Sequence, residues 1–173
     1  NSGAMTVWAD KSSGTFENCL FSGNSVSGSA MTPGSAVFVR SYSGTGTTTV
    51  DFINCTFSAN KTTQNVGVIS SQTFSGHVVE IGLYNCLLWR NLNSQGESGT
   101  NTSLYMTGAG TNTSIIEYSL LQGKNPTGTG NLDGTTTTYD PSFLIEADPA
   151  TAPTNAGDFR LHINSPVIDM GTA

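Results

Sequence analysis

Charged residues are scarce in this chain: they make up 10% of its 173 residues, and only six residues are basic. The six Lys and Arg residues stand singly, so no basic stripe could follow a phosphate backbone. The net charge of -6 argues further against nucleic acid as a partner. The chain also has no run of about 18 apolar residues and no basic amphipathic stretch, which predicts no membrane insertion by this segment.

Runs of helix-forming residues are missing as well. Gly, Ser, Thr and Asn are frequent, and stretches such as TGTGNLDGTTTT (127–138) disfavour helices. Short alternating segments rich in β-branched and aromatic residues predict strands, for example AVFV (36–39), VDFI (50–53) and VVEIGL (78–83). We therefore expect an all-β fold.

One motif occurs three times: FENCLFSGN (16–24), DFINCTFSAN (51–60) and GLYNCLLWRN (82–91). A looser fourth copy, IIEYSLLQGKN (115–125), has Ser119 at the cysteine position. The cysteine positions are spaced by 36, 31 and 33 residues. Repeats of this length are typical of solenoids, propellers and arrays. We predict a β-solenoid of about four to five coils, with coils over 1–125 ending near 24, 60, 91 and 125, and a closing segment over 126–173.

The three cysteines occupy equivalent repeat positions. Stacked strands lie about 4.8 Å apart, whereas a disulfide needs its Cβ atoms roughly 3.5 to 4.5 Å apart, so we expect a buried ladder of reduced thiols. No histidine lies near them in sequence, which argues against a zinc site or a catalytic thiol. The predicted thiol ladder consists of Cys19, Cys55 and Cys86.

Two asparagines recur at fixed offsets in each repeat. Asparagine tolerates the left-handed backbone of tight bends, and its amide can bond to the copies above and below it. We predict structural ladders here in preference to a sugar-binding role. One ladder consists of Asn18, Asn54 and Asn85, and the other of Asn24, Asn60 and Asn91.

Each motif follows a second apolar stretch, which gives two strand zones per coil. Aligning the zones predicts continuous interior columns, as a stacked core requires. The predicted core columns are Met5, Val37, Val68 and Leu104; Phe16, Phe52, Leu83 and Ile116; and, in the second half of the motif, Phe21, Phe57 and Leu88. Phe38, Ile69 and Tyr105 then alternate out of the core, and we interpret them either as an exposed stripe or as a lateral surface that packs against another domain.

Several motifs resemble those of bacterial surface proteins. FSGN (21–24), FSAN (57–60), SGAM (2–5) and GSAV (34–37) resemble the FxxN and GGA[ILV] repeats of polymorphic outer-membrane proteins. DPSF (140–143), GDFRL (157–161) and SPVIDMG (165–171) resemble the C-terminal signature of proteins with a choice-of-anchor Q domain. The resemblance implies a right-handed parallel β-helix of the pectin-lyase-like type, extracellular or at a bacterial cell surface. We expect the chain to be a fragment of a longer solenoid.

Catalytic groups are few. Glycoside hydrolysis needs two carboxylates about 5 to 9.5 Å apart. Asp51 and Glu80 are the weak candidates, one coil apart with a one-residue offset that we expect to point them in different directions. No acidic cluster accompanies a basic residue as in the lyases of this fold, and His77 and His162 stand alone. We expect no metal or other cofactor, with structural calcium at the glycine-rich segments 107–113 and 131–135 as the alternative.

We therefore favour a non-catalytic extracellular module, an adhesin, stalk or glycan-binding surface, whose partners are a polysaccharide or cell-surface glycan and neighbouring domains of the same protein. The alternative is a fragment of a polysaccharide lyase or glycoside hydrolase. Flat aromatic rings stack on sugar faces. The candidate ligand-binding residues are Trp8, Phe38, Tyr42, Tyr84, Trp89 and Tyr105.

Overall fold

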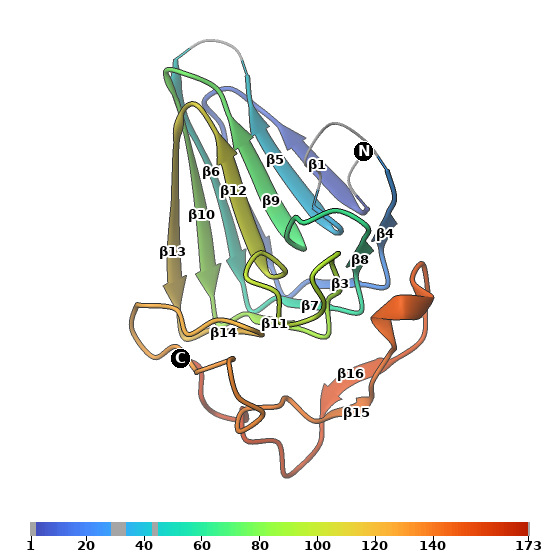
Figure 1. Ribbon diagram of the computed structural model, residues 1–173. Coiled ribbons are helices and arrows are strands. Elements are labelled where there is room, and N and C mark those ends of the chain that lie inside the picture. Colours follow the sequence, from blue (N-terminus) through green and yellow to red (C-terminus); the bar gives the residue numbers. More distant parts are fainter. Residues whose placement is uncertain (1–2, 29–33, 43–44, 173) are drawn as a thin grey trace.

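The computed structural model describes residues 3–28, 34–42 and 45–172, so Ser2 of the SGAM motif lies outside them. The chain winds into a parallel β-solenoid, as predicted, but with about three turns and not the expected four to five coils (Figure 1). Three parallel sheets, here called A, B and C, form its sides, and each contains four strands, one from each level of the solenoid.

The strands of each level follow one another along the chain. Sheet A consists of β1 (Met5–Trp8), β5 (Val37–Ser41), β9 (Ile69–Thr73) and β12 (Leu104–Gly108). Sheet B consists of β2 (Ser13–Glu17), β6 (Gly46–Ile53), β10 (His77–Tyr84) and β13 (Thr111–Glu117). Sheet C consists of β3 (Leu20–Ser22), β7 (Thr56–Ser58), β11 (Leu87–Trp89) and β14 (Leu120–Leu121). A small fourth sheet pairs β4 (Ser25–Val26) with β8 (Lys61–Thr62).

Apolar side chains from the three sheets fill the interior in columns. Phe16, Phe52, Leu83 and Ile116 pair in register along sheet B, which confirms the predicted column. The predicted column of Phe21, Phe57 and Leu88 is likewise in register along sheet C. The rings of Phe21 and Phe57 stack with centroids 4.6 Å apart and planes inclined by 2°. In-register stacking therefore turns each repeated residue into one segment of a continuous core.

The predicted column in sheet A was wrong by one residue. Val37 pairs with Ile69, not with Val68, and Ile69 pairs in turn with Leu104. Val68 lies one position earlier, where its carbonyl accepts the amide of Ala36, and both Val68 and Ile69 are buried. The inferred exposed stripe is also wrong: the register shift puts Ile69 in the core, and Phe38, although it pairs through Ser70 in the column of Tyr105, is only 3% exposed.

The bend between sheets B and C is two residues long in each level, and its first residue has a left-handed backbone. The φ angles are 54° at Asn18, 53° at Asn54 and 54° at Asn85, and Tyr118 has 49° at the fourth level. Asparagine adopts this conformation at lower cost than most residues. The recurring asparagine thus sets the angle between the two sheets. The Asn85 amide also exchanges two hydrogen bonds with the backbone of Thr172.

The second set of asparagines forms a hydrogen-bonded stack. The amide nitrogen of Asn24 donates to Oδ1 of Asn60 at 2.8 Å, and that of Asn60 donates to Oδ1 of Asn91 at 2.8 Å. Each buried amide also donates to backbone carbonyls, Asn60 to Phe21 and Asn91 to Phe57. These bonds satisfy the backbone where each level leaves sheet C.

The cysteines line the inner side of the B–C bend as free thiols. Cys55 Sγ–H donates to the carbonyl of Phe16 and Cys86 Sγ–H to that of Phe52, each at 3.3 Å. Ser119 Oγ–H repeats the pattern at the fourth level, with the carbonyl of Leu83 at 3.3 Å. A hydrogen bond with Cys55, together with burial, raises the pKa of Cys86 above its usual value.

The C-terminal segment adds little to the coil. Leu132 bridges to Leu120 and extends sheet C by one position, after which the chain folds back along the outside of that sheet (Figure 1). There β15 (Phe143–Ile145) pairs antiparallel with β16 (Asp158–Leu161), and a short 3-10 helix, η1 (Pro149–Thr151), lies between them.

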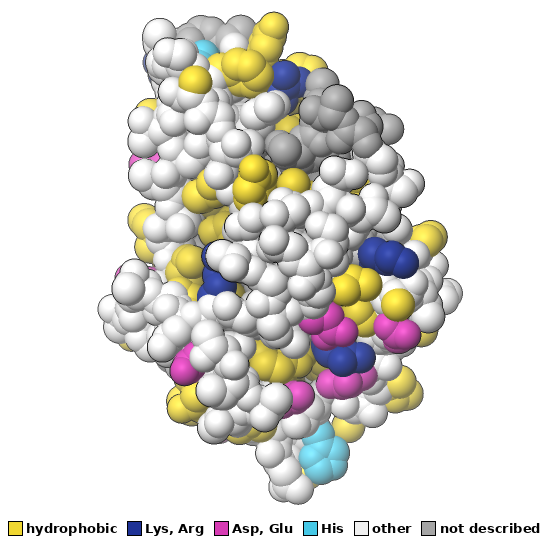
Figure 2. Space-filling view, viewed as in Figure 1, with side chains coloured by type: hydrophobic (Ala, Val, Ile, Leu, Met, Phe, Trp, Pro, Cys, Tyr) yellow, Lys and Arg dark blue, Asp and Glu magenta, His cyan; other side chains and the backbone are white. Residues whose placement is uncertain are grey.

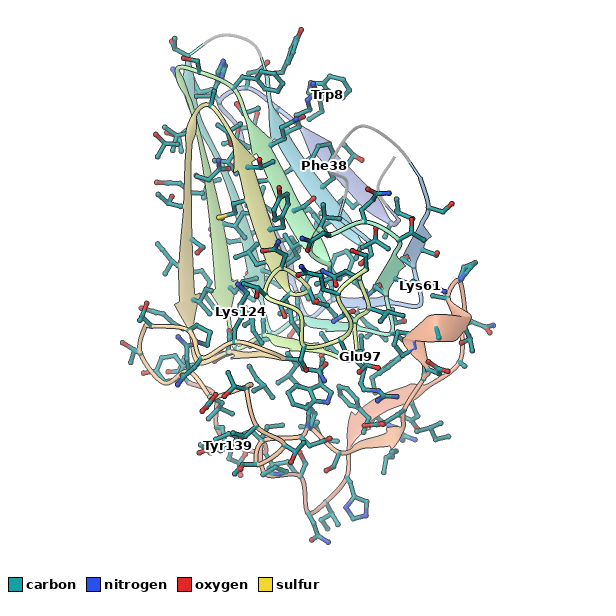
Figure 3. All side chains as sticks on the ribbon, in the orientation of Figure 1. Trp8, Phe38, Lys61, Glu97, Lys124 and Tyr139 are labelled. Atoms are coloured by element: carbon teal, nitrogen blue, oxygen red, sulfur yellow. The ribbon has the colours of Figure 1, made fainter. Side chains whose placement is uncertain are left out.

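Apolar and polar contacts fasten this segment to the solenoid. Its apolar side chains cover Trp89 and Leu120, which point outward from sheet C. Lys61 donates to the carbonyl of Ala150 at 2.9 Å, and the Thr154 amide donates to Gly23 (Figure 3 labels Lys61). Over the described residues, no helix is both long and apolar enough to cross a bilayer.

Replacing a central member of the asparagine stack tests its role in stability. Asn60→Ala removes the donor to two backbone carbonyls and the acceptor for Asn24, all at a buried site. We expect a loss of about 2 to 4 kcal/mol in the free energy of unfolding, measured by urea denaturation. Asn164→Ala, at an exposed position, is the control and should change it by about 0.5 kcal/mol or less. Equal effects of the two changes would contradict a stabilising stack.

Candidate aromatic site

The most exposed cluster of aromatic residues lies where sheet A turns into sheet B. Trp8 is the last residue of β1, Tyr42 follows β5, and Phe74 follows β9. Trp8 pairs with Arg40 across the sheet. Because the levels stack in register, residues at corresponding strand ends come together at one edge of the solenoid. We call Trp8, Arg40, Tyr42 and Phe74 the aromatic cluster.

Arg40 is the centre of this cluster. Its guanidinium carbon lies 4.9 Å from the ring centroid of Trp8, 5.0 Å from that of Tyr42 and 5.1 Å from that of Phe74. The Arg40 residue is only 8% exposed, and such partly desolvated contacts between a cation and a ring are each worth about 0.5 to 2 kcal/mol. One buried cation therefore holds three rings that come from three successive levels.

The rings themselves remain accessible. Trp8 is 62% exposed and Tyr42 is 52% exposed, and their planes are inclined by 82° with centroids 6.5 Å apart. Figure 3 shows Trp8 at the upper edge of the molecule, and hydrophobic side chains gather around a basic one at that edge in Figure 2. Two ring surfaces of different orientation thus reach solvent side by side.

Hydrogen bonds fix the backbone beneath the rings. The amide of Tyr42 donates to Oδ1 of Asp10 at 2.8 Å, which links the first two levels. Ser41 Oγ lies 3.0 Å from Nδ1 of His77, and both residues are buried. These contacts anchor the backbone at Ser41 and Tyr42, directly beneath the rings.

The other predicted ligand residues lie elsewhere. Phe38 and Trp89 are each 3% exposed, so neither presents a ring face to solvent, and Trp89 lies beneath the C-terminal segment. Tyr84 and Tyr105 are half-buried, in β10 and β12. Of the six candidates, the structure brings only Trp8 and Tyr42 together.

The two weak catalytic candidates lie on the outer face of sheet B. Asp51 pairs with Gly82, and Glu80 pairs with Thr49. The offset between the two acids is therefore two residues and not one, so the expectation that they point in different directions was wrong. Gly82 has no side chain, and the Asp51 carboxylate and the Tyr84 ring fill the space beside it.

On the outer face of sheet B, burial and nearby negative charges favour the neutral forms of Asp51 and Tyr84. Partial burial and the negative charge of Glu80 raise the pKa of Asp51. Burial and the charges of Asp51 and Glu117 raise the pKa of Tyr84. In the part of the chain that the structure describes, no group of three or more His, Cys, Asp or Glu side chains is arranged to hold a metal ion.

Sequence reasoning missed Arg40 and Phe74 as members of the cluster. A signal for Arg40 was present, because AMTVW (4–8) and AVFVR (36–40) align Trp8 with Arg40 at the last position of each stretch. No repeated sequence pattern indicated that Phe74 belongs to the cluster. Phe74 lies in the turn after β9, and this turn differs in length from the corresponding turns of the other levels.

Comparison of the chain with known proteins identifies no relative. No family model matches the chain, and neither the curated proteins nor the solved structures contain a match. The fold described here is therefore established by the structure, as a parallel β-solenoid.

The raised pKa of Asp51 makes a prediction about stability and pH. The folded state binds a proton at Asp51 more tightly than the unfolded chain does, so the contribution of this group is present below its ordinary pKa and is lost as the pH rises through the raised pKa. Asp51→Asn should stabilise the protein at pH 7 by about 0.5 kcal/mol or less, since solvent screens the charge, and this gain should vanish below about pH 3.

The measurement is thermal unfolding of both proteins between pH 3 and pH 7. Glu17→Gln, which removes one charge from the exposed end of the same face, is the matched control for net charge. A destabilised Asp51→Asn protein at pH 7 would show that the carboxylate makes a favourable contact there.

Proposed function

We propose that this chain is a non-catalytic β-helix module that binds a polysaccharide or cell-surface glycan through the exposed rings of Trp8 and Tyr42. The observation that supports it is the aromatic cluster: two rings, 62% and 52% exposed, held from behind by the buried guanidinium of Arg40. Aromatic faces pack against the C–H faces of sugar rings, and ordered rings lose little conformational entropy on binding.

The chemistry of the surroundings is consistent with a neutral or weakly charged sugar. The chain has a net charge of -6 with few basic residues, which disfavours a strongly anionic polymer. Ser12, Thr45, Ser75 and Gly76 lie in the described parts of the turns beside the cluster, and the hydroxyl and backbone groups of such residues bond to sugar hydroxyls. The stiff stacked core would present this surface at a fixed place on a stalk.

The resemblance to choice-of-anchor Q proteins and polymorphic outer-membrane proteins supports the finer part of this proposal. If the resemblance reflects kinship, the module is a right-handed β-helix of the pectin-lyase-like class and lies at the surface of a bacterium or outside it. Neighbouring domains of the same protein would then supply the anchor. A secreted setting also suits a ligand that is an extracellular glycan.

The alternative is a fragment of a polysaccharide lyase or glycoside hydrolase. One observation favours it: Asp51 and Glu80 share the outer face of sheet B, and the raised pKa of Asp51 is the property of a general acid. No basic residue of the described chain lies on that face of the sheet, which disfavours lyase chemistry there.

An array of plant, mucin and bacterial polysaccharides tests both functions when retention and cleavage are scored together, with and without calcium. We expect retention without cleavage. Trp8→Ala and Tyr42→Ala should each weaken retention by about tenfold or more, because each removes one stacking ring. Tyr105→Ala, which truncates a half-buried ring outside the cluster, is the matched control and should leave retention unchanged.

Other outcomes separate the alternatives. Cleavage that is lost in Asp51→Asn and Glu80→Gln would replace the binding function with the enzymatic one. Retention that depends on Tyr105 and not on Trp8 would move the glycan site away from the aromatic cluster to strand β12. If the protein neither retains nor cleaves any polysaccharide on the array, both functions are contradicted. The remaining interpretation is then a structural stalk.

A further inference from the structure

A cavity lies at the end of the solenoid formed by the last level. Strands β12 and β13 are the final strands of sheets A and B, so their inward side chains have no further level above them. Leu104 and Met106 from β12, and Ser114 and Ile116 from β13, line a cavity of about 510 Å³. This volume falls within the range of about 300 to 1,000 Å³ that is usual for small-molecule sites.

The walls of this cavity are the continuation of the core. Leu104 stacks on Ile69, and Ile116 stacks on Leu83, both of which are fully buried one level below. Val50, Ile81 and Ser114 form one column through three successive levels of sheet B. In the last level Ser114 thus has a hydroxyl where the two levels below have an aliphatic side chain. The part of the lining that comes from β12 and β13 is therefore apolar at Leu104, Met106 and Ile116, with the Ser114 hydroxyl among them.

The chain itself closes one side of the cavity. Residues 124–127 leave sheet C and pass beside β12 and β13, and Lys124, Asn125, Pro126 and Thr127 all line the cavity. Backbone hydrogen bonds with Gly134 and Leu121 fasten this crossing at Lys124. The space is thus a pocket bounded by an ordered segment, not only the open end of a stack.

Among the described residues that line the pocket, Lys124 alone is charged, and Figure 3 shows it beside the last level. Its side chain is half-buried, and burial lowers its pKa. No acidic side chain of the described residues lies within 4.0 Å of its ammonium group. A partly desolvated cation without a counter-ion favours an anionic ligand, because pairing would offset the cost of its burial.

We propose that this pocket binds an aliphatic monocarboxylate, with its chain against Leu104, Met106 and Ile116 and its carboxylate on the Lys124 ammonium. The apolar walls account for an aliphatic body, and the single cation accounts for a single negative charge. Ser114 and Thr127 supply hydroxyl donors for the second carboxylate oxygen. A phosphate or sulfate ester would find only one cation here and no arginine, which makes a carboxylate the better match.

The test is a titration of the full chain with sodium decanoate, followed by isothermal calorimetry, with 1-decanol as the uncharged probe of the same length. We expect saturable binding of decanoate at one site. Lys124→Met should weaken decanoate binding by about tenfold or more while leaving decanol binding unchanged, because only the charge-assisted bond is lost. Met106→Trp, which fills the pocket, should weaken both.

Lys11→Met is the matched control, because it removes the same charge from an exposed turn at the other end of the solenoid. Thermal unfolding of each variant confirms that it is folded. Decanoate that fails to saturate, or that binds Lys124→Met as tightly as the original chain, would overturn the proposal. This result is independent of the glycan site, since Trp8→Ala should leave decanoate binding unchanged.

Discussion

The structure depends on one constraint: each level must lie on the one below it in register, residue over residue. Parallel backbone hydrogen bonds between levels give most of the contact, but they alone would allow a level to slip by one residue or two. The B–C bend removes this freedom. Its first residue needs a left-handed backbone, and the following cysteine or serine donates to a carbonyl of the level below. Slippage would break both at once.

This constraint explains which parts of the fold the sequence predicted. The columns through Phe52 and Phe57 were predicted correctly, because they lie at fixed offsets from the bend and share its register. Sheet A is separated from the bend by turns and loops of variable length, so its register depended on apolar pattern alone. Val68 and Ile69 are both apolar and both buried, and that pattern could not choose between them. The packing of the folded chain determines that Ile69, and not Val68, pairs with Val37.

The same distinction applies to the aromatic cluster. Trp8 and Tyr42 were candidates because they are aromatic, but aromatic character did not distinguish them from Phe38 and Trp89, which are buried. Exposure depends on which loop or terminal segment covers a strand, and Trp89 is covered by residues of the C-terminal segment, more than forty positions later in the chain. Arg40 was passed over because a single arginine in a strand carries no motif. Its role follows from three rings that meet around it.

Stacking also explains why both proposed sites lie at discontinuities of the solenoid. Within the middle levels, the inward positions of the described strands have a neighbouring level above and below them. The turn between sheets A and B interrupts the repeat, since it is shorter in the last two levels than in the first two, and there the rings of Trp8 and Tyr42 reach solvent. The last level breaks it again, since its inward positions lack a neighbour, and there Lys124 meets an apolar wall. The two proposed binding sites therefore lie where the repeat of the solenoid is interrupted.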